Sequence, residues 1–231
     1  MKNINLFLSF VAEHGLELPS DFLDKISEFC EVLLEANKTT NLVSKNDEQK
    51  LLTRHVADSL IFAAYLSSKS FPTPPSAPRL GGEYWADIGS GAGFPVIPLC
   101  LYFPQTKFFA IESRKKRCEF LNLVKQKLNL QNIEIISGKA ENSNLKNVDI
   151  VSCRAVGSLD TDFELAKTLL KKGGSFLTLK TKRIIEELKA KNNRLLSRAA
   201  IWNYKLPQEQ MEYALVAISS LSSHGKSTSC T

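Results

Sequence analysis

The run YWADIGSGAGFPVIP, residues 84–98, decides the fold of this 231-residue chain. A short apolar segment ends in the acid Asp87, and glycines follow at alternate positions, Gly89, Gly91 and Gly93. Glycine permits tight turns and lets a ligand approach the main chain without a Cβ in the way. We interpret the run as a strand, a candidate ligand-binding turn and the start of a helix.

Short apolar runs alternate with amphipathic segments after residue 84. Strands are expected in YWADI, KFFAIE, IEIIS, VDIVSC and SFLTLKT, and helices in FPVIPLCLYF, RKKRCEFLNLVKQKLNL, LDTDFELAKTLLKK and RIIEELKAKNNRLLS. This alternation predicts an α/β fold with a doubly wound, mostly parallel sheet. Two last apolar runs, AAIWNYKL and EYALVAI, predict an antiparallel hairpin at the sheet edge.

The first 69 residues predict a separate helical region. In SDFLDKISEFCEVLLEANK, residues 20–38, apolar side chains recur at helical spacing, and Ser20 can cap the first turn. A second helical pattern runs from Asp47 to Leu66. We expect a helical N-terminal cap at 1–69, a Pro/Gly-rich linker at 70–83, the α/β domain at 84–220 and a polar tail at 221–231.

Composition limits the classes of function. The net charge of +6 favours an anionic partner, such as nucleic acid or a membrane surface. The five cysteines are scattered without a C-x-x-C pair, so we expect neither a structural zinc site nor a disulfide framework. No apolar run reaches the ~18 residues of a membrane span. The N-terminus also lacks a signal-peptide cleavage site, and we expect a cytoplasmic protein.

The glycine pattern restricts the ligand. A Walker phosphate loop needs a lysine after its last glycine, and none follows here. A dinucleotide fingerprint, G-x-G-x-x-G, is not matched either, because position 94 is Phe. Asp87 would repel a pyrophosphate but suits a ligand with an ammonium group. S-adenosylmethionine, which has an amino-acid end and no phosphate, is therefore the favoured ligand, and a turn that binds nothing is the alternative.

A second acid supports a nucleoside ligand. Glu112 ends the second predicted strand, 23 residues after Gly89, where a carboxylate can accept hydrogen bonds from both ribose hydroxyls. NAD and S-adenosylmethionine both place a ribose at this position, so Glu112 does not distinguish them. It does favour a bound nucleoside over a turn without a ligand.

Several segments together resemble a known family. GSGAGFPVIPL, ESRKKRCEFL, GKAEN, SCRAVGSL and LTLK occur in the order found in the ribosomal RNA small-subunit methyltransferase G family, also called glucose-inhibited division protein B. The resemblance extends upstream through NKTTNLVS and RHVADSL, and so covers nearly the whole chain. It implies a Rossmann-like S-adenosylmethionine-dependent methyltransferase that modifies guanine N7 in 16S rRNA, with that rRNA or the small ribosomal subunit as partner.

The resemblance also implies cofactor contacts. They are expected at Gly89 and Phe94, at Ala140 and Glu141 beside the adenine, and at Arg154. The loop glycines Gly91 and Gly93 and the acid Glu112 complete the candidate cofactor site, and no metal is expected.

Two positions depart from the family pattern. Val96 stands where the family usually has glycine, and Thr181 stands where glycine often follows a lysine. Val96 falls in the first turn of the helix after the loop, where a bulkier side chain has to pack closely. The loop glycines themselves are intact.

Methylation of guanine N7 needs little acid–base chemistry. N7 has a free lone pair and no proton to lose, so an in-line displacement requires alignment and no general base. We therefore expect no proton-transferring catalytic residue. His55, Asp58 and Ser59 form the nearest rival constellation, but no nucleophile elbow accompanies them. We interpret them as a helix surface that docks on the sheet, with Arg54 and Asp58 as an ion pair; a direct role with RNA is the alternative.

A basic run follows Glu112 at the start of a predicted helix. Its members are Arg114, Lys115, Lys116 and Arg117. Cations there oppose the helix dipole, at a cost of about 0.3–1 kcal/mol each. They suit contact with an RNA phosphate backbone, and a solvated face with Lys115 paired to Glu119 is the alternative. Lys180, at the end of the fifth strand, is either a further phosphate contact or a solvated strand end.

Two other functions compete with rRNA methylation. The same fold can methylate a small molecule or a protein, since a fold does not fix its substrate. A non-catalytic ribosome-binding protein with a relic cofactor pocket is the second alternative. The intact glycine loop and Glu112 argue against the relic pocket.

Overall fold

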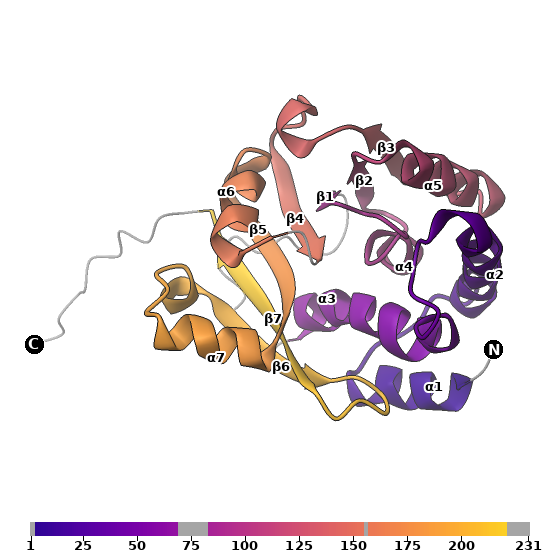
Figure 1. Cartoon of the computed structure of the whole chain (residues 1–231), viewed down its shortest axis with the longest axis horizontal. Helices are drawn as coiled ribbons and strands as arrows, with labels where there is room; N and C mark the ends of the chain where they lie inside the picture. Colours follow the sequence, from indigo (N-terminus) through magenta and orange to yellow (C-terminus); the bar gives the residue numbers. More distant parts are fainter. Residues whose placement is uncertain (1–2, 69–82, 155–156, 221–231) are drawn as a thin grey trace, which may run out of the picture.

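A seven-stranded sheet forms the centre of the computed structural model, which describes residues 3–68, 83–154 and 157–220. The strands lie in the order β3-β2-β1-β4-β5-β7-β6 (Figure 1). Their bounds are β1 Tyr84–Ile88, β2 Lys107–Glu112, β3 Ile133–Ser137, β4 Val148–Arg154, β5 Leu170–Thr181, β6 Ala200–Lys205 and β7 Glu212–Ser219. Strands β1 to β5 pair in parallel, and the hairpin β6–β7 joins β5 in antiparallel fashion. The predicted doubly wound sheet with an antiparallel edge hairpin is confirmed.

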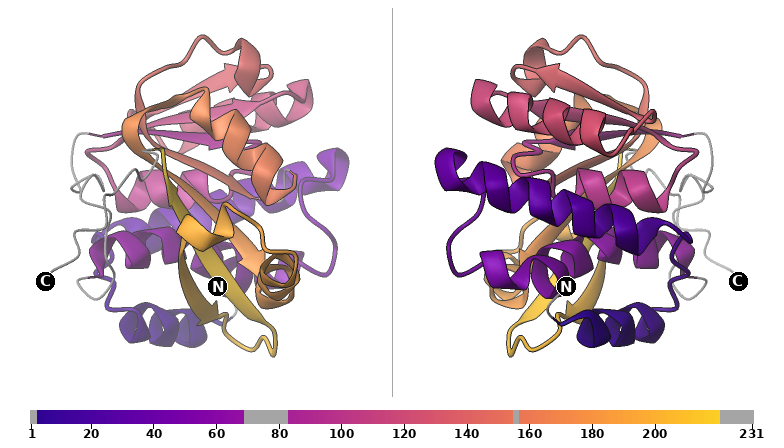
Figure 2. Two further views of the ribbon diagram at one scale, coloured as in Figure 1. Left: turned by 90° about the vertical axis from the view of Figure 1, so that its left-hand side faces the viewer. Right: turned by 90° about the vertical axis from the view of Figure 1, so that its right-hand side faces the viewer.

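Helices cover both faces of this sheet. On one face lie α1 (Ile4–Glu13), α2 (Phe22–Thr40), α3 (Ala57–Ser67), α4 (Val96–Tyr102) and α5 (Lys115–Lys127), and on the other α6 (Leu159–Lys167) and α7 (Lys182–Ala190) (Figure 2). Successive side chains of β1 enter the two opposite cores, as the two-residue period of a strand requires: Trp85 joins the first and Ala86 the second.

The N-terminal helices share the first core with the sheet. Phe62 of α3 packs edge-on against Trp85 of β1, with ring centroids 6.1 Å apart, and both side chains are fully buried. Phe29 of α2 meets Phe94 of the glycine loop at 5.2 Å. This shared core fixes the helical region against the carboxyl edge of the sheet, so its residues contribute to whatever binds there.

The boundaries differ from the predictions at several places, among them the helix predicted over 183–197, which ends at Ala190. Asp21 precedes α2 without a side-chain hydrogen bond, so the cap predicted at Ser20 is wrong. The segment predicted as one helix from residue 47 begins with a 3₁₀ turn, Glu48–Lys50, and a π-helical stretch, Leu51–Val56, before α3. The helix predicted over 159–172 ends at Lys167, and its last residues form the start of the long strand β5.

The linker predicted at 70–83 lies outside the described residues except for residue 83, and the tail at 221–231 lies wholly outside them.

The two residues that depart from the family pattern both have a defined place in the fold. Val96 begins α4 and is fully buried in the first core. Thr181 occupies the N-cap of α7, where its hydroxyl accepts a hydrogen bond from the Ile184 amide at 3.4 Å. A glycine there would lack this hydrogen bond, at a cost of only a few tenths of a kcal/mol.

The described cysteines are structural. Cys100, Cys118 and Cys153 are buried, Cys30 is half-buried, and all four are free thiols. Burial raises the pKa of Cys30 to about 12, so this thiol is no nucleophile at neutral pH. Across the described residues, every helix is too short or too polar to cross a membrane.

Candidate functional site

The glycine loop begins directly after β1, at the carboxyl edge of the sheet. Its glycines have φ angles of 76° (Gly89), 55° (Gly91) and 87° (Gly93), in the region that disfavours side chains. The Gly89 amide donates to the carbonyl of Ile111 at 2.8 Å, which ties the loop to the end of β2. A Cβ on Gly93 would lie 2.8 Å from Ile97 Cγ1, so this glycine serves close packing against α4.

Glu112, the last residue of β2, holds the loop from the side. Its carboxylate is buried and accepts hydrogen bonds from the Gly91 amide at 3.0 Å and from the Arg114 amide at 2.8 Å, one on each oxygen. A carboxylate oxygen has two acceptor positions. One position therefore remains on each oxygen, which suits the two adjacent hydroxyls of a ribose.

A cavity of about 500 Å³ lies in front of the loop, and we call it the glycine-loop cavity. It is lined by Leu42, Val43, Ser44, Asp47, His55, Gly89, Ser90, Gly91, Ala92, Phe94, Glu112, Ser113, Arg114, Arg117 and Arg154. The fold thus brings five of the predicted cofactor residues to one hollow. Gly93, Ala140 and Glu141 are not among the lining residues; Ala140 is buried in a short 3₁₀ helix, Ala140–Asn142, beyond β3.

Asp87 lies beneath the loop, outside the lining of the cavity. One carboxylate oxygen accepts a hydrogen bond from the Ser152 hydroxyl at 2.8 Å, and the other is buried without a hydrogen-bond partner among the described residues. Burial raises the pKa of this carboxyl to about 7, because the charged form loses its hydration. The ammonium contact expected for Asp87 stays a prediction.

Arg154 connects the end of β4 to the helical region. Its Nη1 donates to Asp58 Oδ2 at 3.0 Å, and the Tyr204 hydroxyl of β6 donates to Asp58 Oδ1 at 2.5 Å. The ion pair predicted between Arg54 and Asp58 is therefore wrong: Arg54 pairs with Asp47 at 2.9 Å. Three distant segments meet at one carboxylate, which sequence spacing could not indicate.

His55 completes this cluster as a neutral imidazole. Arginine can only donate, so the contact of 3.1 Å from Arg154 Nη2 makes His55 Nδ1 an acceptor and leaves the proton on Nε2. Burial and the Arg154 charge lower the pKa of His55 to about 3. Its ring stacks on Phe94 with centroids 5.0 Å apart, and the Arg154 guanidinium lies 5.6 Å from the same ring. The sequence analysis favoured a docking surface for His55, because helical spacing alone does not show that this side chain lines the glycine-loop cavity.

The structure divides the predicted basic run. Arg117 reaches toward the loop, with its Nη1 3.9 Å from Glu112 Oε2. Lys115 is 91% exposed and lies 4.0 Å from Glu119, which confirms the predicted pair. Lys180 is nearly buried and pairs with Asp162 at 3.1 Å, so a solvated strand end is wrong for this residue.

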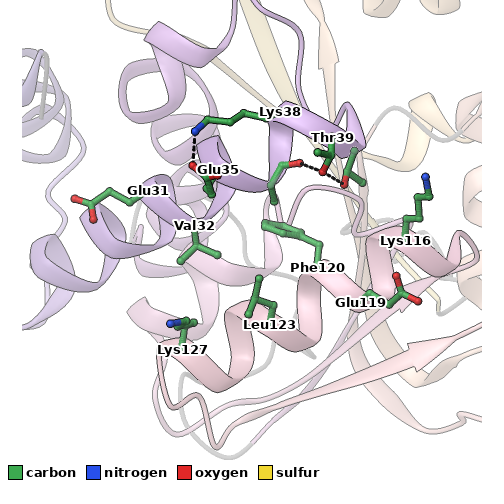
Figure 3. Close-up of a pocket in the computed structure, with 12 residues that line it drawn as sticks. Glu31, Val32, Glu35, Lys38, Thr39, Lys116, Glu119, Phe120, Leu123 and Lys127 are labelled. Atoms are coloured by element: carbon green, nitrogen blue, oxygen red, sulfur yellow. Dashed lines mark hydrogen bonds and ion pairs between the residues drawn. The ribbon is translucent and has the colours of Figure 1, made fainter.

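Two further hollows lie outside the glycine-loop cavity. One, of about 500 Å³, opens beside β4 and β5 and shares His55 and Arg154 with it. The other, of about 840 Å³, is a groove between α2 and α5, with the apolar side chains of Val32, Phe120 and Leu123 between charged ones (Figure 3). It has no lining residue in common with the other two cavities. Within residues 3–68, 83–154 and 157–220, no group of three or more His, Cys, Asp and Glu side chains is placed to hold a metal.

Comparison with known sequences gives a consistent family. The family model described as rRNA small subunit methyltransferase G matches residues 23–210. A protein of that name from Ligilactobacillus salivarius is 32% identical over 222 residues, covering 92% of this chain and 88% of the relative. One from Staphylococcus aureus is 35% identical over 180 residues, covering 76% of this chain and 71% of the relative.

Solved structures support the fold. Precorrin-6y C5,15-methyltransferase from Geobacter metallireducens superposes with a TM-score of 0.51 at 16% identity, covering 79% of this chain and 92% of that one. TYW2 from M. jannaschii, solved in complex with AdoMet, gives 0.50 at 17% identity, covering 62% and 71%. At these identities the similarity shows the fold alone, a Rossmann-like methyltransferase fold.

Proposed function

This chain belongs to the rRNA small subunit methyltransferase G family, and from that membership we propose that it methylates N7 of a guanine in 16S rRNA. It is an S-adenosylmethionine-dependent methyltransferase whose substrate is small-subunit rRNA. The N7 atom, the site residues and the RNA-contacting residues are the parts of the proposal that extend beyond family membership.

The observation that carries the cofactor site in this proposal is the acceptor geometry of Glu112. Its two oxygens are oriented by two backbone amides and keep one acceptor position each, beside a cavity whose volume suits a nucleoside ligand. The loop has neither the lysine of a Walker phosphate loop nor the G-x-G-x-x-G spacing of a dinucleotide fingerprint. The residues present therefore fit S-adenosylmethionine, which carries a ribose and no phosphate.

Each predicted residue has a separate task in this proposal. Gly89 and Gly91 let the main chain approach the ligand, and Glu112 accepts hydrogen bonds from the ribose. Phe94, fixed between Phe29 and His55, provides an apolar surface beside the ligand. Ala140 and Glu141 are proposed for the adenine end. Arg154 is proposed for the amino-acid end, because its guanidinium can pair with a carboxylate.

The proposed methyl transfer requires no acid–base catalysis by a side chain. The cofactor supplies a methyl group on a sulfonium, and guanine N7 offers a lone pair without a proton. No residue then has to accept a proton, and the histidine at the site is unsuited to do so, because the pKa of His55 is lowered to about 3. The protein contributes by orienting the two reactants and by excluding water.

The exposed part of the basic run is proposed to contact rRNA phosphates. Arg114, Lys115 and Lys116 are exposed at the start of α5, beside the glycine-loop cavity. The helix dipole disfavours cations at this end, so their presence needs another reason, and an RNA backbone provides one.

Methyl transfer to small subunits tests the function. Purified protein is incubated with radiolabelled S-adenosylmethionine and 30S subunits from a strain that lacks the gene. We expect label at N7 of a guanine when the rRNA is digested and its nucleosides are separated. Label at another atom would refute the N7 assignment, and label only in ribosomal protein would refute rRNA as substrate.

A further inference from the structure

A loop of the helical region forms part of the wall of the glycine-loop cavity. Residues 42–47 follow the end of α2, and we call them the 42–47 loop; four of them line the cavity, namely Leu42, Val43, Ser44 and Asp47. The other lining residues are His55 and residues at or after the ends of β1, β2 and β4. A ligand that fills this cavity therefore contacts both the edge of the sheet and the 42–47 loop.

Burial of apolar side chains contributes little to the position of this loop. Among residues 42–47, all of which the structure describes, only Leu42 is buried, and residues 44–46 are exposed. A short exposed segment with so few buried contacts belongs to the least stable parts of a fold, because ordering its main chain costs conformational entropy. Directional contacts are therefore needed to fix the loop.

Asn37, in the last turn of α2, supplies these contacts. Its Oδ1 accepts hydrogen bonds from the Leu42 amide at 2.6 Å and from the Val43 amide at 3.0 Å. Its Nδ2 donates to the Val43 carbonyl at 3.1 Å and to Glu48 Oε1 at 2.7 Å. The residue is only 3% exposed, and the four bonds use both of its donors and both of its acceptor positions. Asn37 thus ties the first two residues of the loop to the residue that follows its last one.

The end of α2 does not itself require Asn37. Asn41, with a φ of 50°, already provides the left-handed residue that commonly terminates a helix. A buried side-chain amide costs stability unless its polar atoms are paired, so its place is explained by the loop that it holds. At the other end of the loop, Arg54 pairs with Asp47 at 2.9 Å. The loop is therefore fixed at both ends before a ligand binds.

We propose that Asn37 is a positioning residue of the donor site, which holds the 42–47 loop as a preorganised wall against bound S-adenosylmethionine. This inference rests on the proposed function, which places the cofactor in the glycine-loop cavity. A wall that is already ordered adds no cost of ordering when the ligand binds, whereas a released loop has to be ordered at that moment. The apparent Kd then rises by the inverse of the fraction of molecules in which the loop is in place.

Two asparagine substitutions separate this role from a general loss of stability. Asn37→Ala removes the four bonds to the loop and to Glu48. Asn132→Ala is the matched control, because Asn132 Nδ2 donates to three main-chain carbonyls, those of residues 100, 103 and 106, at 3.0, 3.2 and 3.2 Å. Asn132 directly precedes β3, at the amino edge of the sheet, and does not line the glycine-loop cavity. Calorimetry with S-adenosylmethionine and thermal melting are measured for both variants.

We expect Asn37→Ala to raise the Kd for S-adenosylmethionine about tenfold, as for a loop that is in place in roughly one molecule in ten. Asn132→Ala should lower the melting temperature and keep the wild-type Kd. An unchanged Kd in Asn37→Ala, or an equal increase in both variants, would overturn the positioning role. Failure of the wild type to bind S-adenosylmethionine would instead reject the proposed function.

An exchange of donor and acceptor tests the hydrogen bonds themselves. Asn37→Asp retains the acceptors for the Leu42 and Val43 amides, but it removes both donors and places a second carboxylate against Glu48. Glu48→Gln supplies a donor toward position 37, so the double variant should recover part of the affinity that Asn37→Asp loses. Glu48→Gln alone should bind like the wild type, because its amide oxygen still accepts from Asn37. A double variant that binds no better than Asn37→Asp would contradict the proposal.

Hydrogen exchange provides a readout on the wild-type protein that depends on neither turnover nor a variant. S-adenosylmethionine should slow amide exchange in the 42–47 loop, because the ligand covers this loop from the side of the cavity. The segment before β2, residues 103–106, serves as the internal control and should be unaffected. Exchange in the 42–47 loop that stays the same when the cofactor binds would refute the contact between loop and ligand, and with it the role of Asn37.

Discussion

Arg154, at the end of β4, and Asp58, in the first turn of α3, form an ion pair with 3.0 Å between Nη1 and Oδ2. The two residues lie 96 positions apart in the sequence. Their side chains are mostly buried, and the Tyr204 hydroxyl closes the other side of the carboxylate. Residues of the N-terminal helical region therefore line both the glycine-loop cavity and the cavity beside β4 and β5.

The Arg154–Asp58 pair should contribute measurably to stability. A double-mutant cycle with Arg154→Gln and Asp58→Asn, followed by urea unfolding, should give a coupling free energy of about 1–3 kcal/mol, as expected for residues in one buried network. The exposed helical pair Arg183–Glu187, at 3.3 Å, is the control and should give about 0.3–0.5 kcal/mol. Equal coupling in the two cycles would show that the buried pair has no special role.

The sequence was sufficient for elements whose determinants are local. The strand 84–88 and its glycine turn were predictable because apolar alternation and φ requirements lie within a few residues. The long strand β5 was predicted too short, because residues 170–172 continue the helical pattern that starts at Leu159. In the structure Leu170 pairs with Val148 of β4, and a register shift precedes the next pair, Ser175 with Ile150. Here tertiary pairing overrode the local preference.

The candidate site was only partly predictable for the same reason. Glu112 and Arg154 could be predicted as neighbours of one site, because each ends a predicted parallel strand and the carboxyl ends of parallel strands lie at the same edge of the sheet. His55 was not, because its contacts with Phe94 and Arg154 come from the docking of the helical region. The separation of Arg117 from Lys115 likewise depends on the orientation of α5, which a run of four cations does not reveal.

His55 should act as a hydrogen-bond acceptor for Arg154. His55→Asn retains an acceptor, whereas His55→Phe keeps a ring against Phe94 and removes the acceptor. We expect the rate of methyl transfer to fall less in His55→Asn than in His55→Phe. The difference between the two variants should correspond to one charge-assisted hydrogen bond, roughly tenfold or more. Steady-state transfer to 30S subunits measures this difference, and a smaller loss in the phenylalanine variant would show that stacking is the more important contact.

The lowered pKa of His55 also predicts how the stability of the fold changes with pH. Its pKa is about 3 in the fold and 6.5 in the unfolded chain, so the unfolded state binds the proton first. The stability that depends on neutral His55 is therefore fully present above pH 6.5 and is lost as the pH falls toward 3. Urea unfolding of His55→Asn should show a weaker loss over this window than the wild type.

Asp87 should have the opposite effect on stability. Its pKa is raised from 3.8 to about 7, so between these values the folded state holds a proton that the unfolded state has released. Stability contributed by Asp87 therefore falls as the pH rises through this window, by up to about 4 kcal/mol. Asp87→Asn, which cannot ionise, should gain stability relative to the wild type at pH 8 and not at pH 4.

The exposed Asp24 provides the control for this experiment, because Asp24→Asn makes the same substitution at the surface of α2 and should not reproduce the gain in stability at pH 8. Calorimetry on Asp87→Asn also tests the expected ammonium contact. Weaker binding of S-adenosylmethionine would support that contact, and unchanged binding would refute it.

Glu112 should determine affinity for the cofactor. Glu112→Gln retains an acceptor for the Gly91 amide but removes the negative charge that strengthens hydrogen bonds from a ribose. The loss of one charge-assisted bond, about 1.5–3 kcal/mol, corresponds to a roughly tenfold to hundredfold weaker Kd in calorimetry. Glu119→Gln, on the exposed face of α5, should bind normally. Equal affinities for Glu112→Gln and the wild type would exclude a ribose at this carboxylate.

The exposed lysines at the start of α5 should appear in the salt dependence of rRNA binding. Each phosphate contact contributes about 0.7–0.9 to the slope of log K against log salt concentration. Replacing Lys115 and Lys116 by alanine should therefore reduce the slope by about 1.4–1.8 in filter binding with 16S rRNA, while cofactor binding persists. Lys125 and Lys127, in the last turn of the same helix, form the matched pair for comparison. Because the charge removed is the same, an equal reduction for both pairs would mean that net charge, and not a phosphate contact at the helix start, governs the interaction.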